Sequence, residues 1–253
     1  MFKKGLISII KRPDNLVIAS NVLLGAIVRY LYILKYPVQP RDSYTYVEII
    51  RNWEATGIIE DGVGIIPLGL WIPKIVSKCL SQDVMRCGIM INLFLGLCII
   101  VVISQIGALI FREKKAVFVI GLIASTHPTL VRFSCEFLRE NSYIFFTTLS
   151  ILYYIKFIKR RKLFYVVSTS IAAAMSFACR LEGLELLVIF LVLIFTECIT
   201  SKQGLRKTIA SVSAFIVTYA LSLVVLLAIM DVKDNNRESI LKKMKIRTIE
   251  RIK

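Results

Sequence analysis

Long runs of apolar residues are the feature that most restricts what this chain can fold into. Leu, Ile and Val are concentrated in blocks of about 17–25 residues, the length at which a helix crosses roughly 30 Å of hydrocarbon. In lipid only helices and closed barrels satisfy their backbone groups, and these blocks lack the apolar–polar alternation of barrel strands. Hydrophobic residues make up 57% of the chain, and its mean hydropathy is +0.72. We therefore predict an all-α, polytopic membrane protein.

The blocks predict about seven transmembrane helices. Their expected ranges are 16–36, 88–111, 116–130, 134–157, 163–179, 184–200 and 208–230. With the long loop at 37–87 they form one predicted module, residues 1–230, and a basic tail follows at 231–253.

Lysine and arginine are unevenly divided between the predicted loops. The amino terminus and the loops after the second, fourth and sixth helices hold 4, 3, 5 and 3 of them, whereas the opposite short loops hold only Arg132, Arg139 and Arg180. Because cytoplasmic loops are enriched in these residues, we expect a cytoplasmic amino terminus, with Asp42, His127 and Arg180 on the outer side. The tail disagrees, since its eight Lys/Arg would then lie outside. Either one helix is wrongly assigned or the tail lies on the membrane surface.

The net charge of +16 could indicate a nucleic-acid partner, but its distribution argues against one. The basic residues lie mainly in short loops between apolar blocks, and no basic face with interleaved aromatic residues is evident. We predict the lipid bilayer as a partner and no nucleic acid.

The loop at 37–87 contains two predicted interfacial helices. Within 43–56, Tyr46, Ile50 and Trp53 share one helical face and charged residues take the other, which is typical of a helix lying in the membrane interface. The segment 65–80 is apolar but too short to span the bilayer. We expect a second interfacial helix there.

Cysteine and histidine provide little evidence for a metal site. The six cysteines are scattered, and His127 is the single histidine, so a Cys/His zinc site is not supported. Cys79 and Cys87 could form a disulfide, but separate apolar thiols are the favoured interpretation.

Charged residues close to the membrane boundary need an explanation, because they are costly there unless paired or beside a cavity. Arg29 lies inside the first predicted helix, and the others follow near the outer boundary: Asp42, Glu136, Arg139, Glu140, Arg180, Glu182 and Glu185. In a structural interpretation Arg139 pairs with Glu136 or Glu140, and Arg180 lies beside Glu182. In a functional interpretation these residues converge around Asp42.

The order of these features resembles the GT-C class of membrane glycosyltransferases, and within it the protein O-mannosyltransferase and lipid A aminoarabinose-transferase group. The similar elements are, in chain order, Arg29, Asp42 with Tyr46, Gly57, Pro67-Leu68 with Trp71, His127-Pro128, Ser134-Cys135-Glu136 with Arg139 and Tyr143, and the segment 178–183. Ser43 departs from the group, which commonly has Glu at that position. Members are also usually much longer, so an inactive remnant is an alternative.

The resemblance implies transfer of a sugar from a polyprenyl phosphate to a glycan, lipid or protein acceptor on the outer face. Asp42 would act as the base, and Glu136 as a second carboxylate that orients the acceptor or a divalent cation; no other cofactor is expected. Arg139 and Arg180 would bind the lipid phosphate, because a guanidinium pairs well with phosphate oxygens. Tyr46 is a further candidate for substrate binding, and His127, Lys74 and Arg132 are weaker candidates for the phosphate.

A transporter or flippase is the competing class of function. Such a protein would be expected to contain internal repeats and a charged or broken helix at mid-membrane. Neither is clear in the sequence, in which Arg29 is the only deep charge. A scaffold protein is the third interpretation.

Overall fold

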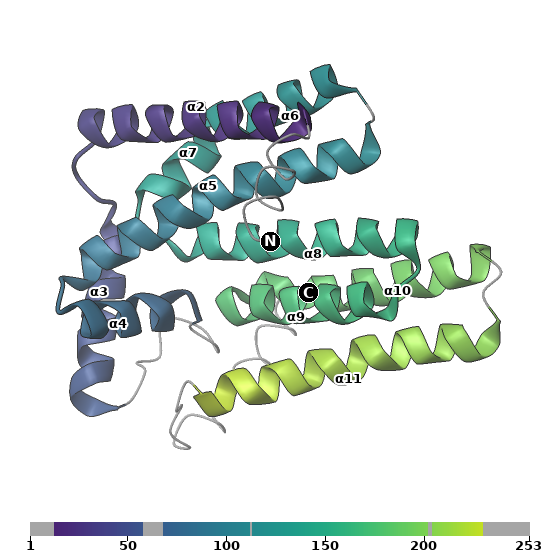
Figure 1. The fold of residues 1–253 in the computed structure, drawn as a ribbon. Helices are drawn as coiled ribbons and strands as arrows, with labels where there is room; N and C mark the ends of the chain where they lie inside the picture. Colours follow the sequence, from purple (N-terminus) through teal and green to yellow (C-terminus); the bar gives the residue numbers. More distant parts are fainter. Residues whose placement is uncertain (1–12, 58–67, 112, 202–203, 230–253) are drawn as a thin grey trace, which may run out of the picture.

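The computed structural model describes residues 13–57, 68–111, 113–201 and 204–229, and it contains no strand in these ranges (Figure 1). The prediction of an all-α fold is therefore confirmed for the described residues. The long helices are α2 (Pro13–Lys35), α5 (Val84–Ile110), α8 (Arg139–Arg160), α9 (Leu163–Cys179), α10 (Leu184–Thr200) and α11 (Leu205–Ile229). The shorter elements are α3 (Arg41–Thr56), α4 (Leu68–Leu80), α6 (Lys114–Thr126), α7 (Pro128–Cys135) and the 3-10 turn η1 (Leu181–Gly183).

The long helices form two halves that meet along α5 and α8 (Figure 1). In the amino-terminal half, α2 packs against α5, α6 and α7; in the carboxy-terminal half, α9 packs against α8, α10 and α11. The helices α3 and α4 lie at one end of this bundle, beside the start of α5 and of α8. We call this the Tyr46 end, after the α3 residue at its centre.

The number of helices that could cross a membrane is smaller than expected. Four are long and apolar enough: 15–35, 84–110, 181–200 and 206–229. A fifth is obtained if α6 and α7 are counted as one bent span, which is still fewer than the seven predicted. The helix α9 has 17 residues, and α8 carries charged residues in its first and last turns. The chain therefore has the character of a multi-pass membrane protein, with fewer clear spans than the sequence indicated.

The third and fourth predicted helices have different boundaries in the structure. Ser134 and Cys135 end α7 instead of starting the next helix, and α8 begins only at Arg139. The chain bends by 52° between α6 and α7, where Pro128 occupies the first turn of α7. Proline has no backbone N–H to continue the preceding helix, which explains a break at this position.

The amino-terminal half is held together by small and polar residues. A Cβ added at Gly121 would lie 2.0 Å from Nδ2 of Asn21, and one added at Gly96 would lie 2.1 Å from Oγ of Ser134. The Ser125 hydroxyl donates to the backbone oxygens of Asn21 and Gly121, each at 2.7 Å. Small residues allow such close approach of helices in lipid, where hydrogen bonds between helices supplement packing. We call this set of contacts the polar seam.

Arg29 is buried within the polar seam, with 1% of its surface exposed. Its guanidinium donates to three backbone oxygens: Gly25 at 3.1 Å, Ser125 at 3.3 Å and Gly96 at 3.5 Å. The Ser125 carbonyl belongs to the last turn of α6, where helical carbonyls lose their usual donors and the helix dipole is negative. Arg29 therefore supplies a donor and a positive charge at the α6–α7 break.

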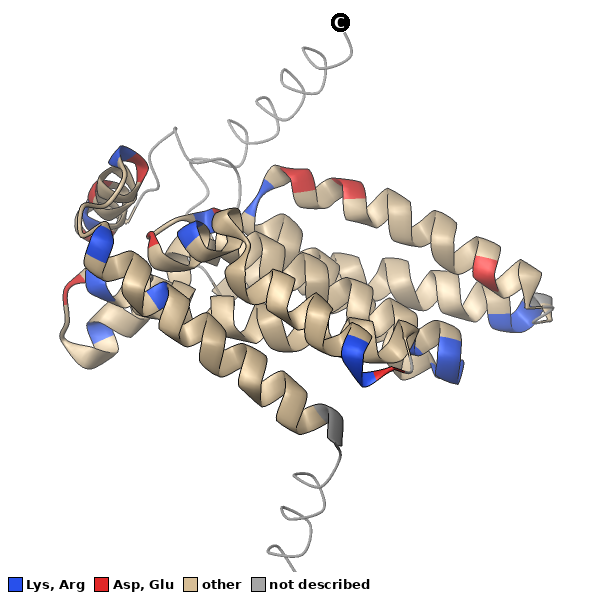
Figure 2. Ribbon diagram, turned by 90° about the horizontal axis from the view of Figure 1, so that it is seen from above, with Lys and Arg blue, Asp and Glu red and all other residues tan. Residues whose placement is uncertain are grey.

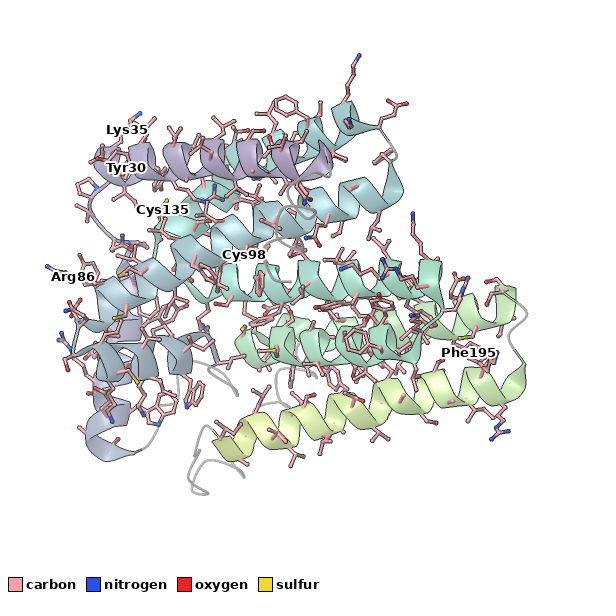
Figure 3. The ribbon with its side chains drawn as sticks, viewed as in Figure 1. Tyr30, Lys35, Arg86, Cys98, Cys135 and Phe195 are labelled. Atoms are coloured by element: carbon pink, nitrogen blue, oxygen red, sulfur yellow. The ribbon has the colours of Figure 1, made fainter. Side chains whose placement is uncertain are left out.

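The seam extends to Cys135, which Figure 3 places beside α2. Its thiol donates to the backbone oxygen of Arg29 at 3.6 Å. All six cysteines are free, so the interpretation of Cys79 and Cys87 as unpaired thiols is confirmed.

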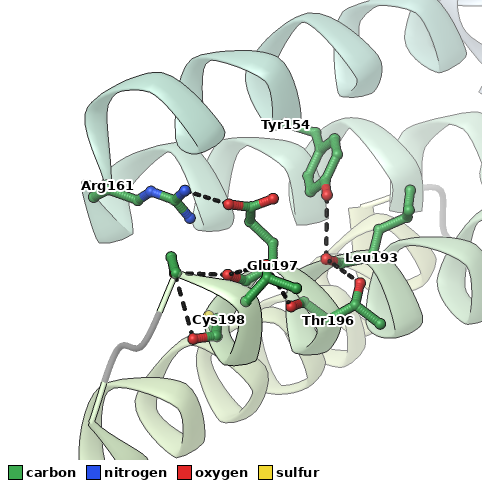
Figure 4. A network of polar contacts seen from close by, with 8 residues as sticks. Tyr154, Arg161, Leu193, Thr196, Glu197 and Cys198 are labelled. Carbon is green, nitrogen blue, oxygen red and sulfur yellow. Dashed lines mark hydrogen bonds and ion pairs between the residues drawn. The ribbon is translucent and has the colours of Figure 1, made fainter.

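The carboxy-terminal half has an aromatic core instead. The rings of Phe190 and Phe215 are 6.3 Å apart, and Tyr154 and Tyr219 extend the stack on either side, at 5.6 and 6.2 Å. Polar contacts join α8 to α10 near the other end of the bundle (Figure 4): the Tyr154 hydroxyl donates to the Leu193 oxygen at 3.1 Å, and Arg161 pairs with Glu197. These contacts hold α10 against α8.

The two ends of the bundle differ in charge (Figure 2). The end opposite Tyr46 is mainly basic, with Lys114, Lys115, Lys159, Arg160, Arg161, Lys162, Arg206 and Lys207 against Glu113 and Glu197. The Tyr46 end carries both signs of charge. Which end faces the cytoplasm stays a prediction, and the tail at 231–253 lies outside the described residues.

Candidate functional site

The helix α3 provides the centre of the candidate site. It buries Tyr46, Ile50 and Trp53 on one face, as the amphipathic pattern predicted, and it ends at Gly57, whose φ of 72° is in the left-handed region. Glycine adopts that conformation without the steric cost that other residues incur. The helix predicted at 65–80 is present as α4, although residues 65–67 lie outside the described ranges; its place in the membrane interface stays a prediction.

Two arginines from different parts of the chain lie near Tyr46. The Nε of Arg139 donates to the Tyr46 hydroxyl at 3.3 Å, and the guanidinium carbon lies 5.2 Å from the centre of the Tyr46 ring. Arg180 is brought to the same region by its ion pair with Glu140, the residue that follows Arg139. The structure thus brings three predicted site residues together, from α3, the start of α8 and the end of α9.

Arg180 is held by two carboxylates. Its Nε and Nη2 donate to Glu182 at 3.1 and 3.3 Å, and its Nη1 pairs with Glu140. The hydrogen bond with Glu182 is the main cause that raises the pKa of Arg180 above its usual value; burial opposes this, and the charge of Glu140 adds to it. The predicted proximity of Arg180 and Glu182 is confirmed. A phosphate that binds Arg180 would compete with both carboxylates.

Glu136 belongs to a neighbouring cluster. Its carboxylate accepts two bonds from Nε of Arg132, at 3.0 and 3.1 Å, and one from the Tyr32 hydroxyl at 3.2 Å. The carboxylates of Glu136 and Glu140 are therefore engaged with Arg132 and Arg180, which differs from the expected pairing of either with Arg139. With 8% of its surface exposed, Glu136 is enclosed, whereas the Arg132 side chain is 55% exposed.

Asp42 is exposed in the first turn of α3, one helical turn before Tyr46. Residues at this spacing have neighbouring positions on a helix surface. Within the described residues, its carboxylate has no hydrogen bond or ion pair. Asp42 is therefore available to a molecule that approaches α3 from solvent or from the membrane surface.

Lys74 and His127 lie apart from the contacts of Tyr46. The Lys74 ammonium is 3.7 Å from the centre of the Trp53 ring, one of the close cation–π contacts of the structure. His127 is exposed in the break between α6 and α7.

Sequence analysis missed the residues that hold the linker between α7 and α8. The amides of Gln39 and Asn92 bind its backbone, and Asn141 in turn binds Asn92. The available signal was Asn92 itself, a polar residue within the most apolar block of the chain.

Among the described residues, no group of three or more His, Cys, Asp or Glu side chains could hold a metal ion. A divalent cation at the site stays a prediction. No protein-family model, curated protein or solved structure matches this chain.

Proposed function

We propose that this protein is an integral membrane glycosyltransferase that moves a sugar from a polyprenyl phosphate to an acceptor. One observation carries the proposal: Arg139 contacts Tyr46, and Arg180 pairs with the adjacent Glu140, at one end of an apolar bundle and one helical turn from the exposed Asp42. Two converging guanidinium groups suit a phosphate, and the apolar helices beside them suit a polyprenyl chain. A nearby solvent-accessible carboxylate suits proton abstraction from an acceptor hydroxyl.

The roles follow from these positions. Asp42 is the proposed base, Arg139 and Arg180 are the proposed phosphate ligands, and Tyr46 orients Arg139 through its hydroxyl. Glu136 would act as a second carboxylate only after release from Arg132 and Tyr32. Lys74, Arg132 and His127 are weaker candidates for substrate contact.

We also infer seven crossings of the membrane. In this arrangement α6 and α7 together form one bent span, and α8 and α9 cross as a hairpin between α5 and α10. The positive-inside rule then places the basic end and the amino terminus in the cytoplasm, and the Tyr46 end on the outer face. The bilayer is the first partner, and the acceptor is a glycan, lipid or protein.

The decisive experiment is a transfer assay with the purified chain, radiolabelled polyprenyl-phosphate sugars and a mixed acceptor extract. Asp42→Asn should lower kcat by about 10²–10⁴-fold, because it removes a general base without changing size. Glu48→Gln is the matched control, since Glu48 is an exposed carboxylate on the same helix. Unchanged activity in Asp42→Asn would exclude Asp42 as the base, and a wild-type chain that consumes no donor would favour the remnant interpretation.

Arg180→Ala should mainly weaken donor binding. A charged hydrogen bond contributes about 1.5–3 kcal/mol, so the dissociation constant should rise by about 10- to 100-fold. A titration with the labelled donor measures it. An unchanged constant would remove Arg180 from the proposed phosphate site.

A second candidate function, passage of a substrate across the membrane, is favoured by the bend between α6 and α7. A broken helix beside a buried charge, here Arg29, is a feature expected of transporters. Proteoliposomes loaded with labelled polyprenyl-phosphate sugar distinguish the two functions. Movement of the intact donor between leaflets without sugar transfer would support transport and contradict the glycosyltransferase proposal.

A further inference from the structure

Residues 136–138 form the linker between α7 and α8 and lead directly to Arg139. An irregular segment in an apolar bundle needs partners for its backbone groups, because lipid offers none. Gln39, which follows α2, supplies two of them: its Nε2 donates to the Cys135 oxygen at 3.3 Å, and its Oε1 accepts from the Phe137 N–H at 3.0 Å. One amide thus binds the linker on both sides of Glu136.

Asn92 of α5 binds the linker from another helix. Its Nδ2 donates to the oxygens of Glu136 at 2.7 Å and of Leu138 at 2.8 Å. Asn92 is 3% exposed, and the fully buried Asn141 of α8 donates to its backbone oxygen at 2.8 Å. Because a buried amide that loses its partners is costly, these bonds favour one arrangement of the linker.

The side chain of Phe137 completes the attachment. It is almost fully buried against Gly88, where an added Cβ would lie 2.4 Å from the ring, and its ring meets that of Tyr46 edge-on at 6.1 Å. The Leu138 N–H donates to the Glu136 oxygen at 2.9 Å, which tightens the turn. The linker is therefore fixed to the end of α2, to α5 and to α3, immediately before Arg139.

We propose that Gln39 and Asn92 are positioning residues that set where Arg139 meets the donor phosphate. The inference rests on the proposed function of the Tyr46 end. Each amide acts through its hydrogen bonds to backbone atoms of residues 135–138. A displacement of about 1 Å in a reacting group can cost about 10²-fold in rate, so a fixed backbone at this point matters to transfer.

The test combines two readouts on Asn92→Leu and Gln39→Leu, with Ser104→Ala as the matched control. Ser104 is a buried polar residue of the same helix as Asn92 and lies away from the linker. Hydrogen exchange of a peptide covering 136–138 should accelerate about tenfold or more in both Leu variants and stay unchanged in the control. Gln39→Glu, which keeps the acceptor for the Phe137 N–H but loses the donor, should give an intermediate rate.

The second readout is the split between kinetic constants in the transfer assay. A displaced Arg139 should raise KM for the donor by about tenfold and leave KM for the acceptor unchanged. A variant that merely unfolds would lower the active fraction and leave both KM values alone. Faster linker exchange with an unchanged donor KM would overturn the positioning role.

The two readouts separate this inference from the proposed function. Linker exchange that is unchanged in both Leu variants overturns the inference even if the enzyme is active. A wild-type chain that does not turn over the donor refutes the proposed function instead. Hydrogen exchange needs no donor, so it still decides whether the two amides fix the linker.

Discussion

The two halves of the bundle are held together in different ways. The carboxy-terminal half packs large rings, such as Phe190 and Phe215, against one another. The amino-terminal half brings backbones close through Gly96 and Gly121 and adds hydrogen bonds from Ser125. Apolar side chains gain little from leaving lipid, so close packing and interhelical hydrogen bonds provide the attraction in the polar seam. We therefore expect the polar seam to tolerate changes in side-chain size less well than the aromatic core does.

The candidate site lies where these halves meet. The linker before Arg139 is bound by residues of the amino-terminal half, Gln39 and Asn92, while Arg180 comes from the carboxy-terminal half. Tyr46 contacts Arg139 from α3, outside both halves. The spacing of the two arginines therefore depends on how the halves join.

The largest effect is expected from Gly96→Val, which tests how tight the polar seam is. The new Cβ would lie 2.1 Å from Oγ of Ser134 and 3.2 Å from Nε of Arg29. Overpacking should cost about 3 kcal/mol or more, and the Tm should fall by about 6–12 °C. A thermal scan with a thiol-reactive dye measures this, because four of the six cysteines are buried.

The control for this variant is Gly204→Val, where nothing lies within 4 Å of the added Cβ. Its Tm should match that of the wild type. Equal Tm values for Gly96→Val and the wild type would show that the seam can adjust, and the contrast between the halves would then be wrong.

Phe215→Ala tests the aromatic core and should have the next largest effect. Such truncations cost about 3–5 kcal/mol in soluble cores, but the transfer term is small in lipid, so we expect about 2–3 kcal/mol. The matched control is Val217→Ala, an exposed position on the same helix, which should change the Tm very little. A larger fall in Tm for Phe215→Ala than for Gly96→Val would contradict the prediction that the polar seam is the less tolerant half.

Glu182→Gln tests the place where the halves meet. It removes one negative charge beside Arg180, whose raised pKa keeps the guanidinium protonated across the usable pH range. Donor affinity should therefore rise by about three- to tenfold, equivalent to about 0.6–1.4 kcal/mol. The control is Glu185→Gln, an exposed carboxylate in the first turn of α10. Weaker donor binding in Glu182→Gln would mean that Glu182 holds Arg180 in place for the phosphate.

Ser125→Ala should have the smallest effect, and it measures the contribution of one interhelical hydrogen bond in the polar seam. Its hydroxyl binds both its own helix and α2, and such interhelical bonds average about 0.6 kcal/mol in membranes. The Tm should fall by about 1–2 °C. Thr196→Ala is the control in the other half, because the Thr196 hydroxyl binds only carbonyls of its own helix. An equal fall in both variants would show that the bond to α2 contributes nothing measurable.

Local features of this protein were readable from the sequence because they depend on neighbours in the chain. The buried face of α3 and the pairing of Arg180 with Glu182 both fall within short spacings. The fourth helix was predicted to start too early because no glycine or proline marks the linker, and no local signal marks the bonds from Gln39 and Asn92.

The amino-acid sequence by itself determined the class of fold, since long apolar segments can satisfy their backbone groups in lipid only as helices or closed barrels. It also placed Tyr46 on the buried face of an amphipathic helix, although the structure starts that helix two residues earlier and so includes Asp42. Only the tertiary structure decided that Arg180 pairs with Glu140, 40 residues away. It alone brought Arg139 to Tyr46, 93 residues away. Partners so distant in the chain are chosen by helix packing, which the periodicity of a single segment does not encode.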